Sequence, residues 1–169
     1  MRWKNVSTAP IGRRGRTRKV TMAGSYQGGC RCGQIRYECH AAPIAVTLCY
    51  CRDCQRWSGG ACGNYVIMPA TAVTRQGHTT GYSVQAESTR VVCREFCPAC
   101  GSPVFAATPH LLAITVASFD DPSPFTPTMA IWLDSAQPWA VIPDTIARFP
   151  RNPPLSSGAD PEQRNDGNP

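Results

Sequence analysis

The sequence lacks the long apolar segments of a membrane protein and the histidine clusters of many metal sites. No apolar run approaches the roughly 18 residues that a membrane span needs, so we expect no membrane partner. Its 3 histidines stand in unrelated contexts, which gives no reason to read them as metal ligands. Long segments without a proline or a glycine are also scarce, because the chain has 16 prolines and 14 glycines. This composition favours many short strands and turns over long helices.

Acidic residues are absent from residues 1–21, and this explains the formal net charge of +6. That segment carries seven arginines and lysines, whereas the rest of the chain has 10 basic and 11 acidic residues. The positive charge therefore belongs to a terminal segment and not to a folded face, so we expect no specific nucleic-acid partner. A nucleic-acid or cytoskeletal role would depend on this segment alone. We expect residues 1–22 to be a disordered basic extension, or the start to be assigned too far upstream of Met22.

The length suggests one domain, which we place at residues 23–150, followed by a disordered polar tail at 151–169. Alternating or β-branched runs between turn residues predict strands. These runs are GQIRYEC, PIAVTLCY, GNYVIMP, STRVVCREF, PVFA, HLLAITVASF and MAIWL. One short helix is predicted around CRDCQRWSG, ended by glycines. The expected fold class is mainly β, with little helix.

What the sequence has in abundance is cysteine, with 10 in the chain. No apolar secretion signal follows the paired arginines near the N-terminus, so we expect a reducing, cytoplasmic location. Clustered cysteines in a reducing compartment indicate metal binding more than disulfides.

Two short cysteine pairs predict a structural zinc site. Cys30 and Cys32 form one pair, Cys97 and Cys100 the other, and each is followed by glycine. Both spacings place two sulfurs on one side of the chain, and two such pairs complete a tetrahedral site. The site would connect distant parts of the fold, so its binding energy would be folding energy. The alternative is a set of buried cysteines or a redox pair.

A third cluster, Cys49, Cys51 and Cys54, predicts a second zinc with only three protein ligands. Three ligands and one open position are the general form of a catalytic zinc site. Three thiolates make the metal a weak Lewis acid that favours a soft sulfur ligand, so the expected partner is a thiol. The alternative is a closed site in which Cys62 or Cys93 is the fourth ligand. Otherwise we expect these two cysteines and Cys39 to be small apolar side chains.

Basic residues near the third cluster are candidates to bind the carboxylates of an anionic thiol. Arg52 and Arg56 flank Cys54, and Arg94 comes shortly before Cys97. The alternative for each is an ordinary solvated arginine.

Four segments in order resemble the glutathione-dependent formaldehyde-activating enzyme family, which includes centromere protein V. They are GGCRCGQIRYEC, CYCRDCQRWSGG, FCPACGSPVF and the stretch from SFDDP to IARFP, and together they span about residues 27–150. The resemblance implies a β-tent fold of small antiparallel sheets. It also implies a structural zinc on Cys30, Cys32, Cys97 and Cys100, and a second on Cys49, Cys51 and Cys54, near which glutathione binds.

The implied function is that of a zinc-dependent carbon–sulfur lyase acting on S-(hydroxymethyl)glutathione, the adduct of glutathione and formaldehyde. Two positions depart from the family pattern. Tyr50 stands where the family usually has histidine, and Ala130 precedes the Ile-Trp pair in place of another histidine. These changes favour the alternative of a non-catalytic zinc module that binds a small thiol or a protein partner. The sequence leaves open the physiological substrate and the oligomeric state.

Overall fold

The structure, a computed structural model, describes residues 25–86 and 88–154 and is built mainly from β-strands. The mainly β prediction with little helix is confirmed. The prediction for residues 1–22, and the prediction of a disordered tail at 151–169 except for its first four residues, lie outside the described residues.

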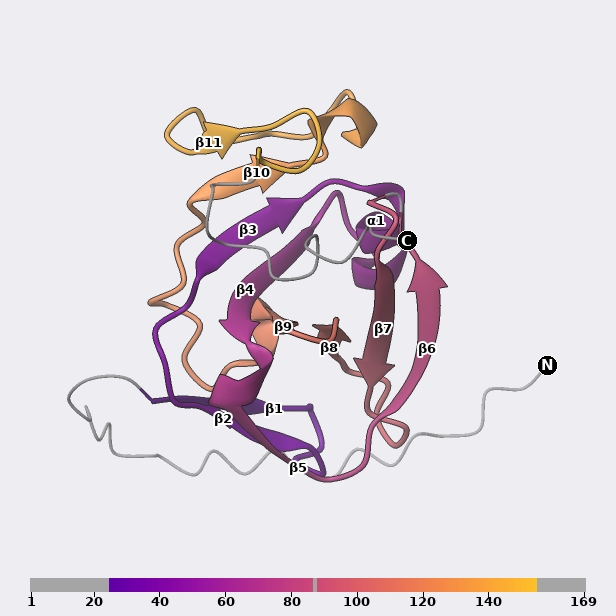
Figure 1. Cartoon of the computed structure of the whole chain (residues 1–169), viewed down its shortest axis with the longest axis vertical. Coiled ribbons are helices and arrows are strands. Elements are labelled where there is room, and N and C mark those ends of the chain that lie inside the picture. The colour runs from indigo at the N-terminus through magenta and orange to yellow at the C-terminus, as the bar shows by residue number, and fades with distance from the viewer. Residues whose placement is uncertain (1–24, 87, 155–169) are drawn as a thin grey trace, which may run out of the picture.

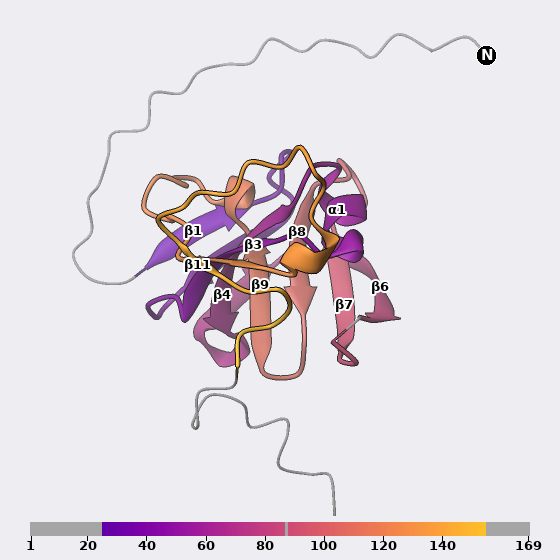
Figure 2. The same cartoon turned by 90° about the horizontal axis from the view of Figure 1, so that it is seen from above.

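A large sheet of eight strands runs through the structure in the order β11-β10-β3-β4-β9-β8-β7-β6. Figure 2 shows β3, β4, β9, β8, β7 and β6 following one another across it. All its pairings are antiparallel except those of β10, which lies parallel to β3 and to β11. Its strands are β3 Ala45–Cys49, β4 Gly63–Pro69, β6 Thr80–Gln85, β7 Val91–Phe96, β8 Pro103–Ala107, β9 Leu111–Thr115, β10 Met129–Ile131 and β11 Ala147–Arg148.

A small antiparallel sheet has the order β1-β2-β5 and lies at one end of the large sheet, at the bottom of Figure 1. Its strands are β1 Tyr26–Gly29, β2 Arg36–Cys39 and β5 Val73–Gln76. One helix is present among the described residues, with three short 3-10 turns: α1 Arg52–Ser58, η1 Ala70–Ala72, η2 Val116–Ser118 and η3 Leu133–Ser135.

The two faces of the large sheet have different roles, because successive side chains of a strand point to opposite faces. In β4, Val66 and Met68 are fully buried in the core that the two sheets enclose. Tyr65 and Ile67, the alternate residues of the same strand, belong to the opposite face and pack around three of the cysteines. This strand therefore has apolar residues on both faces, which explains its nearly continuous apolar sequence.

Aromatic rings join the small sheet to the large one. The Tyr37 ring of β2 meets Phe105 of β8 at a centroid distance of 5.4 Å and Phe119 at 5.3 Å, both edge to face. The Tyr37 hydroxyl shares a hydrogen bond with Ser118 Oγ at 2.8 Å. These contacts fix the position of β2 over the core.

Helix α1 starts and ends where the sequence predicts. Cys51 is its N-cap, with extended backbone and a sulfur that accepts a hydrogen bond from the Cys54 amide at 3.4 Å. Gly59 ends the helix in the left-handed region at φ 69°, where glycine has no steric penalty. Within the described ranges no helix has the length and apolarity needed to cross a membrane.

We predict that Gly28→Ala lowers the free energy of unfolding by about 1–3 kcal/mol, the usual cost of overpacking a core. A methyl group at Gly28 would collide with the Tyr37 ring and with the carbonyl oxygen of Ser118. Denaturant unfolding measures the change. Gly60→Ala is the matched control, because its nearest neighbour would be 3.8 Å away. Equal stability of the two variants would contradict the packing described for β1.

Candidate metal centres

Four cysteine sulfurs from two distant turns lie within 4.8 Å of one another. Cys30 and Cys32 lie in the turn between β1 and β2, and Cys97 and Cys100 lie between β7 and β8. Cys32 Sγ is 3.5 Å from Cys30 Sγ and 3.7 Å from Cys97 Sγ. Sulfurs that share a tetrahedral zinc at ~2.3 Å are about 3.8 Å apart, so the cluster has the spacing of a metal site.

The two turns have similar geometry. Gly33 and Gly101 follow the pairs with φ of 80° and 72°, which only glycine adopts at low cost. Their amides donate to the carbonyls of Cys30 and Cys97, at 3.1 and 2.8 Å. The Ile35 amide also donates to Cys30 Sγ at 3.2 Å. Backbone hydrogen bonds thus shape both turns so that the thiols point to a common centre.

One hydrogen bond favours the ionised form of a thiol in this cluster. Cys100 Sγ lies 3.2 Å from Ser102 Oγ, and this contact lowers the pKa of the Cys100 thiol to about 5. A thiolate is the form that binds metal. The four-cysteine cluster can therefore hold a metal ion that connects the small sheet to the large one.

The second cluster consists of Cys49, Cys51 and Cys54, whose sulfurs also lie within 4.8 Å of one another. Cys49 is the last residue of β3, Cys51 caps α1, and Cys54 lies in the first turn of that helix. All three are buried. The strand end and the helix start thus bring the three sulfurs together without any distant cysteine. This cluster can hold a metal ion through three protein ligands.

Cys62 and Cys93 do not belong to either sulfur cluster. Cys62 lies beside Tyr50, and Cys93 lies on β7 opposite Ser83. Both are half-buried, whereas Cys39 is fully buried in the core as a small apolar side chain. The geometry therefore favours a three-cysteine site over a site closed by Cys62 or Cys93.

The charge in the second cluster is concentrated on Cys54. Hydrogen bonds from Cys49 and Cys51, together with the nearby Arg94, lower the pKa of the Cys54 thiol to about 3. Hydrogen bonds with Cys51 and Cys54 raise the pKa of Cys49. Arg94 Nη2 donates to Cys54 Sγ at 3.8 Å, and its guanidinium lies 5.8 Å from the centre of the Trp57 ring.

Arg94 is the candidate binding residue whose position the sequence reveals least. It comes from β7 and is only 3 % exposed, and its Nη1 has no hydrogen-bond partner among the described residues. The Tyr65 hydroxyl is equally buried near Cys54 and has no well-oriented partner, although the proximity of Cys54 and burial raise its pKa. Unpaired buried donors are costly, so two of them beside three thiols indicate a place for a ligand.

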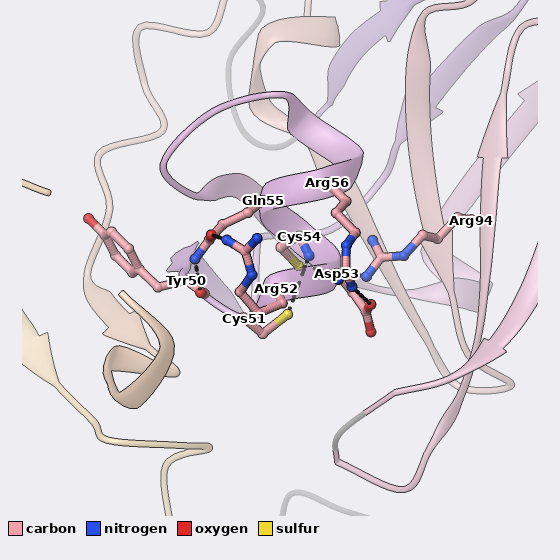
Figure 3. A network of polar contacts seen from close by, with 8 residues as sticks. All are labelled: Tyr50, Cys51, Arg52, Asp53, Cys54, Gln55, Arg56 and Arg94. Carbon is pink, nitrogen blue, oxygen red and sulfur yellow. Dashed lines mark hydrogen bonds and ion pairs between the residues drawn. The ribbon is translucent and has the colours of Figure 1, made fainter. Parts of the chain in front are cut away.

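Gln55 is a residue that the sequence did not identify, and it fixes the helix in place. This buried side chain donates from Nε2 to the carbonyls of Tyr50 at 2.5 Å and Ser135 at 2.9 Å. Its Oε1 accepts hydrogen bonds from Arg52 and from Gln137. Figure 3 shows Gln55 with Tyr50 and Arg52 beside Cys51 and Cys54. Gln55 therefore determines where the start of α1 lies relative to η3.

Arg52 and Arg56, the predicted carboxylate-binding residues, do not line the cavity at the cysteines. Arg52 contacts Gln55, and Arg56 is largely exposed and lies 3.7 Å from Asp53. Figure 3 shows that Tyr50 points away from the sulfurs of Cys51 and Cys54. Ala130 is buried in β10 and also lies outside the cavity lining. A thiol-binding role for Arg52 and Arg56 remains a prediction that these contacts do not support.

A cavity of about 180 Å³ opens beside the second cluster, on the sheet face opposite the core. All three of its cysteines line the cavity, together with Tyr65 and Arg94. Trp132 forms part of the wall and packs on the cysteines. Its indole donates to Asn152 Oδ1 at 2.9 Å, so a residue predicted to lie in the C-terminal tail contributes to the cavity.

Comparison with known proteins identifies the family. No curated protein matches the chain significantly. A crystal structure of a Rhodobacter sphaeroides protein is 19% identical, and the alignment covers 56% of this chain and 87% of that one with a TM-score of 0.45. The profile of the family described as glutathione-dependent formaldehyde-activating enzyme matches residues 25–135, more than half of the chain. The chain therefore belongs to the glutathione-dependent formaldehyde-activating enzyme family.

Proposed function

We propose that this protein is a zinc-dependent carbon–sulfur lyase that forms and cleaves the adduct of a thiol, such as glutathione, with an aldehyde. The observation that carries the proposal is the cavity in which three cysteine sulfurs face an unpaired guanidinium nitrogen. The family supports glutathione and formaldehyde as the reactants. Ten free thiols support a reducing, cytoplasmic setting.

The donor sets fit two zinc ions per chain. Cys30, Cys32, Cys97 and Cys100 would hold one structural ion, and Cys49, Cys51 and Cys54 would hold the other. When bound at the three-cysteine site, zinc lowers the pKa of a thiol in the fourth position, so that its sulfur is held as a thiolate. A zinc ion held by three thiolates would bind thiolate sulfur in preference to water.

The reaction balances without an oxidant or a reductant. The thiolate sulfur attacks the aldehyde carbon, a carbon–sulfur bond forms, and the electron pair of the carbon–oxygen π bond moves to oxygen. The thiol has released its proton to solvent on ionisation, and the oxygen takes a proton from solvent water and becomes the hydroxyl of the adduct. Cleavage is the reverse of these steps.

Arg94 and Tyr65 are placed to assist the oxygen. Arg94 Nη1 and the Tyr65 hydroxyl are buried donors beside Cys54 and have no well-oriented partner. In our proposal they donate hydrogen bonds to the oxygen as its negative charge develops. Fixed donors in a water-poor cavity stabilise such charge more than solvent does. The same cavity holds the thiol and the aldehyde next to each other.

We expect elemental analysis to find close to two zinc ions per chain, and the two sites to respond differently to mutation. Zinc binding at a closed site contributes roughly 10 kcal/mol or more, which is comparable to the whole stability of a domain, about 5–15 kcal/mol. Cys100→Ser should therefore prevent folding. Cys51→Ser should leave a folded chain with about one tightly held zinc, as circular dichroism and metal analysis would show.

Cys62→Ser is the matched control, because Cys62 lies outside both clusters, and it should retain both ions. If Cys51→Ser unfolded the chain as completely as Cys100→Ser, both sites would be structural.

The catalytic proposal is tested by exchange NMR at equilibrium among glutathione, formaldehyde and their adduct. The wild type should speed this exchange above the rate without enzyme. Arg94→Met should lower the enzymatic rate by about 100-fold, the usual effect of losing one such donor. Arg94→Lys should fold and recover part of the rate, because it keeps the charge.

Arg56→Met and Tyr50→His are the control variants, since neither side chain lines the cavity, and both should retain the wild-type rate. Loss of activity in Arg56→Met, with Arg94→Met unaffected, would instead favour the solvent-facing arginine as the binding group. Glutathione binding without faster exchange would identify a non-catalytic thiol-binding module. Absence of glutathione binding in calorimetry would reject the thiol function itself.

A further inference from the structure

The cavity beside the three cysteines is larger and more apolar than the hydroxymethyl group of a formaldehyde adduct requires. Its volume of about 180 Å³ exceeds the ~150 Å³ of an engineered apolar cavity that accepts a benzene ring. The hydroxymethyl group of the formaldehyde adduct has only one carbon and one oxygen. The wall combines apolar residues, which include Val92, Leu111 and Ile131, with the polar residues Thr47, Ser88, Arg90, Thr108 and Asn152.

The cavity has space because two small residues lie in the middle of a row of four paired residues that runs across the large sheet. Strand pairing places Ile67 opposite Ala113, Ala113 opposite Ala106, and Ala106 opposite Arg94. All four side chains line the cavity. Neighbouring strands are ~4.8 Å apart, so Ile67 and Arg94 are separated by roughly 14 Å. The two alanines between them form a floor that is lower than the residues at its ends.

The sulfurs and the Arg94 guanidinium border this floor. The three cysteines pack against Ile67 and Ala113, and Arg94 at the other end of the row reaches Cys54 with its Nη2 and leaves Nη1 unpaired. A ligand whose sulfur lies at the cysteines and whose oxygen lies at Arg94 would therefore have its carbon substituent over Ala106 and Ala113. Burial of hydrocarbon on such a surface is favourable, whereas the charged backbone of glutathione would gain nothing there.

We propose that this floor binds the hydrocarbon group of an aldehyde larger than formaldehyde, so that the substrate class is thiol adducts of aldehydes with about three to six carbons. This inference rests on the proposed function and specifies its substrate. The sulfur of the adduct lies at the three cysteines and its hydroxyl at Arg94. The alkyl or aryl group covers Ala106 and Ala113, and the glutathione part extends toward the mouth of the cavity.

Calorimetry with S-methyl-, S-butyl- and S-hexylglutathione tests the inference on the zinc-loaded wild-type chain. These stable thioethers carry the sulfur and the carbon chain of the adducts without their reactivity. Full burial of a methylene is worth about fourfold in affinity. S-butylglutathione should therefore bind at least tenfold more tightly than S-methylglutathione.

Ala113→Leu fills the floor and should abolish this preference for longer chains while glutathione itself still binds. Ala106→Val is a second, smaller filling variant, and it should weaken the preference in the same direction. Ala147→Leu is the matched control, since Ala147 is exposed on β11 and lies outside the cavity, and it should behave as wild type.

Two outcomes would overturn the inference, and they can be told apart. If glutathione binds but affinity does not rise with chain length, the floor does not bind hydrocarbon, and the proposed function remains. The same conclusion follows if the filling variants keep the preference for longer chains. If neither glutathione nor any of its S-alkyl derivatives binds, the proposed function fails together with the inference.

Discussion

The charge balance between three buried thiols and one buried guanidinium is the constraint on which this site depends. A buried arginine without a counter-charge is strongly unfavourable, and so is a cluster of thiolates without a cation. Arg94 and Cys54 satisfy part of each requirement through their contact at 3.8 Å. With a divalent ion on three thiolates the centre would carry one negative charge, which Arg94 would neutralise. With a metal bound, the ion, the thiolates and the arginine would form one electrostatic unit, although the protein groups come from β3, α1 and β7.

The architecture keeps this unit in place by using both faces of one sheet. The core face packs against the small sheet, where Tyr37, Phe105 and Phe119 hold the two layers together. The other face supplies the floor and walls of the cavity. Since both are faces of the same strands, the groups around the ligand stand on a rigid support. A metal held by the four-cysteine cluster would strengthen this support by joining the β1–β2 turn to the β7–β8 turn, next to the strand that carries Arg94.

Much of the fold was predictable because its signals are local. Strands such as β4 are apolar on both faces, and α1 ends at a glycine that the sequence marks clearly. The strands β1, β5, β6 and β11 were not predicted. They are short or largely exposed, so their conformation depends on partners far away in the sequence and not on their own apolar pattern.

The candidate site was also predictable only where its residues lie close together in the sequence. Spacing identified both cysteine clusters, because two or three ligands of each site are close in sequence. It favoured Arg52 and Arg56 over Arg94 for the same reason, since they are the neighbours of Cys54 in the chain. Arg94 is 40 residues from Cys54, and only the strand order of the large sheet brings it there. Gln55 was missed because a single glutamine in a helix has no sequence pattern that distinguishes a buried hydrogen-bonding centre from a surface residue.

In our proposal the three-cysteine cluster holds a metal whose fourth position accepts an external thiol. ¹¹³Cd NMR of the cadmium-substituted protein can examine this site, because the cadmium chemical shift reports the number of sulfur ligands. We expect two resonances, one typical of four sulfurs and one typical of three. Added glutathione should move the second toward the four-sulfur position and leave the first unchanged. Two four-sulfur resonances before any thiol is added, or a three-sulfur resonance that saturating glutathione does not move, would contradict the account.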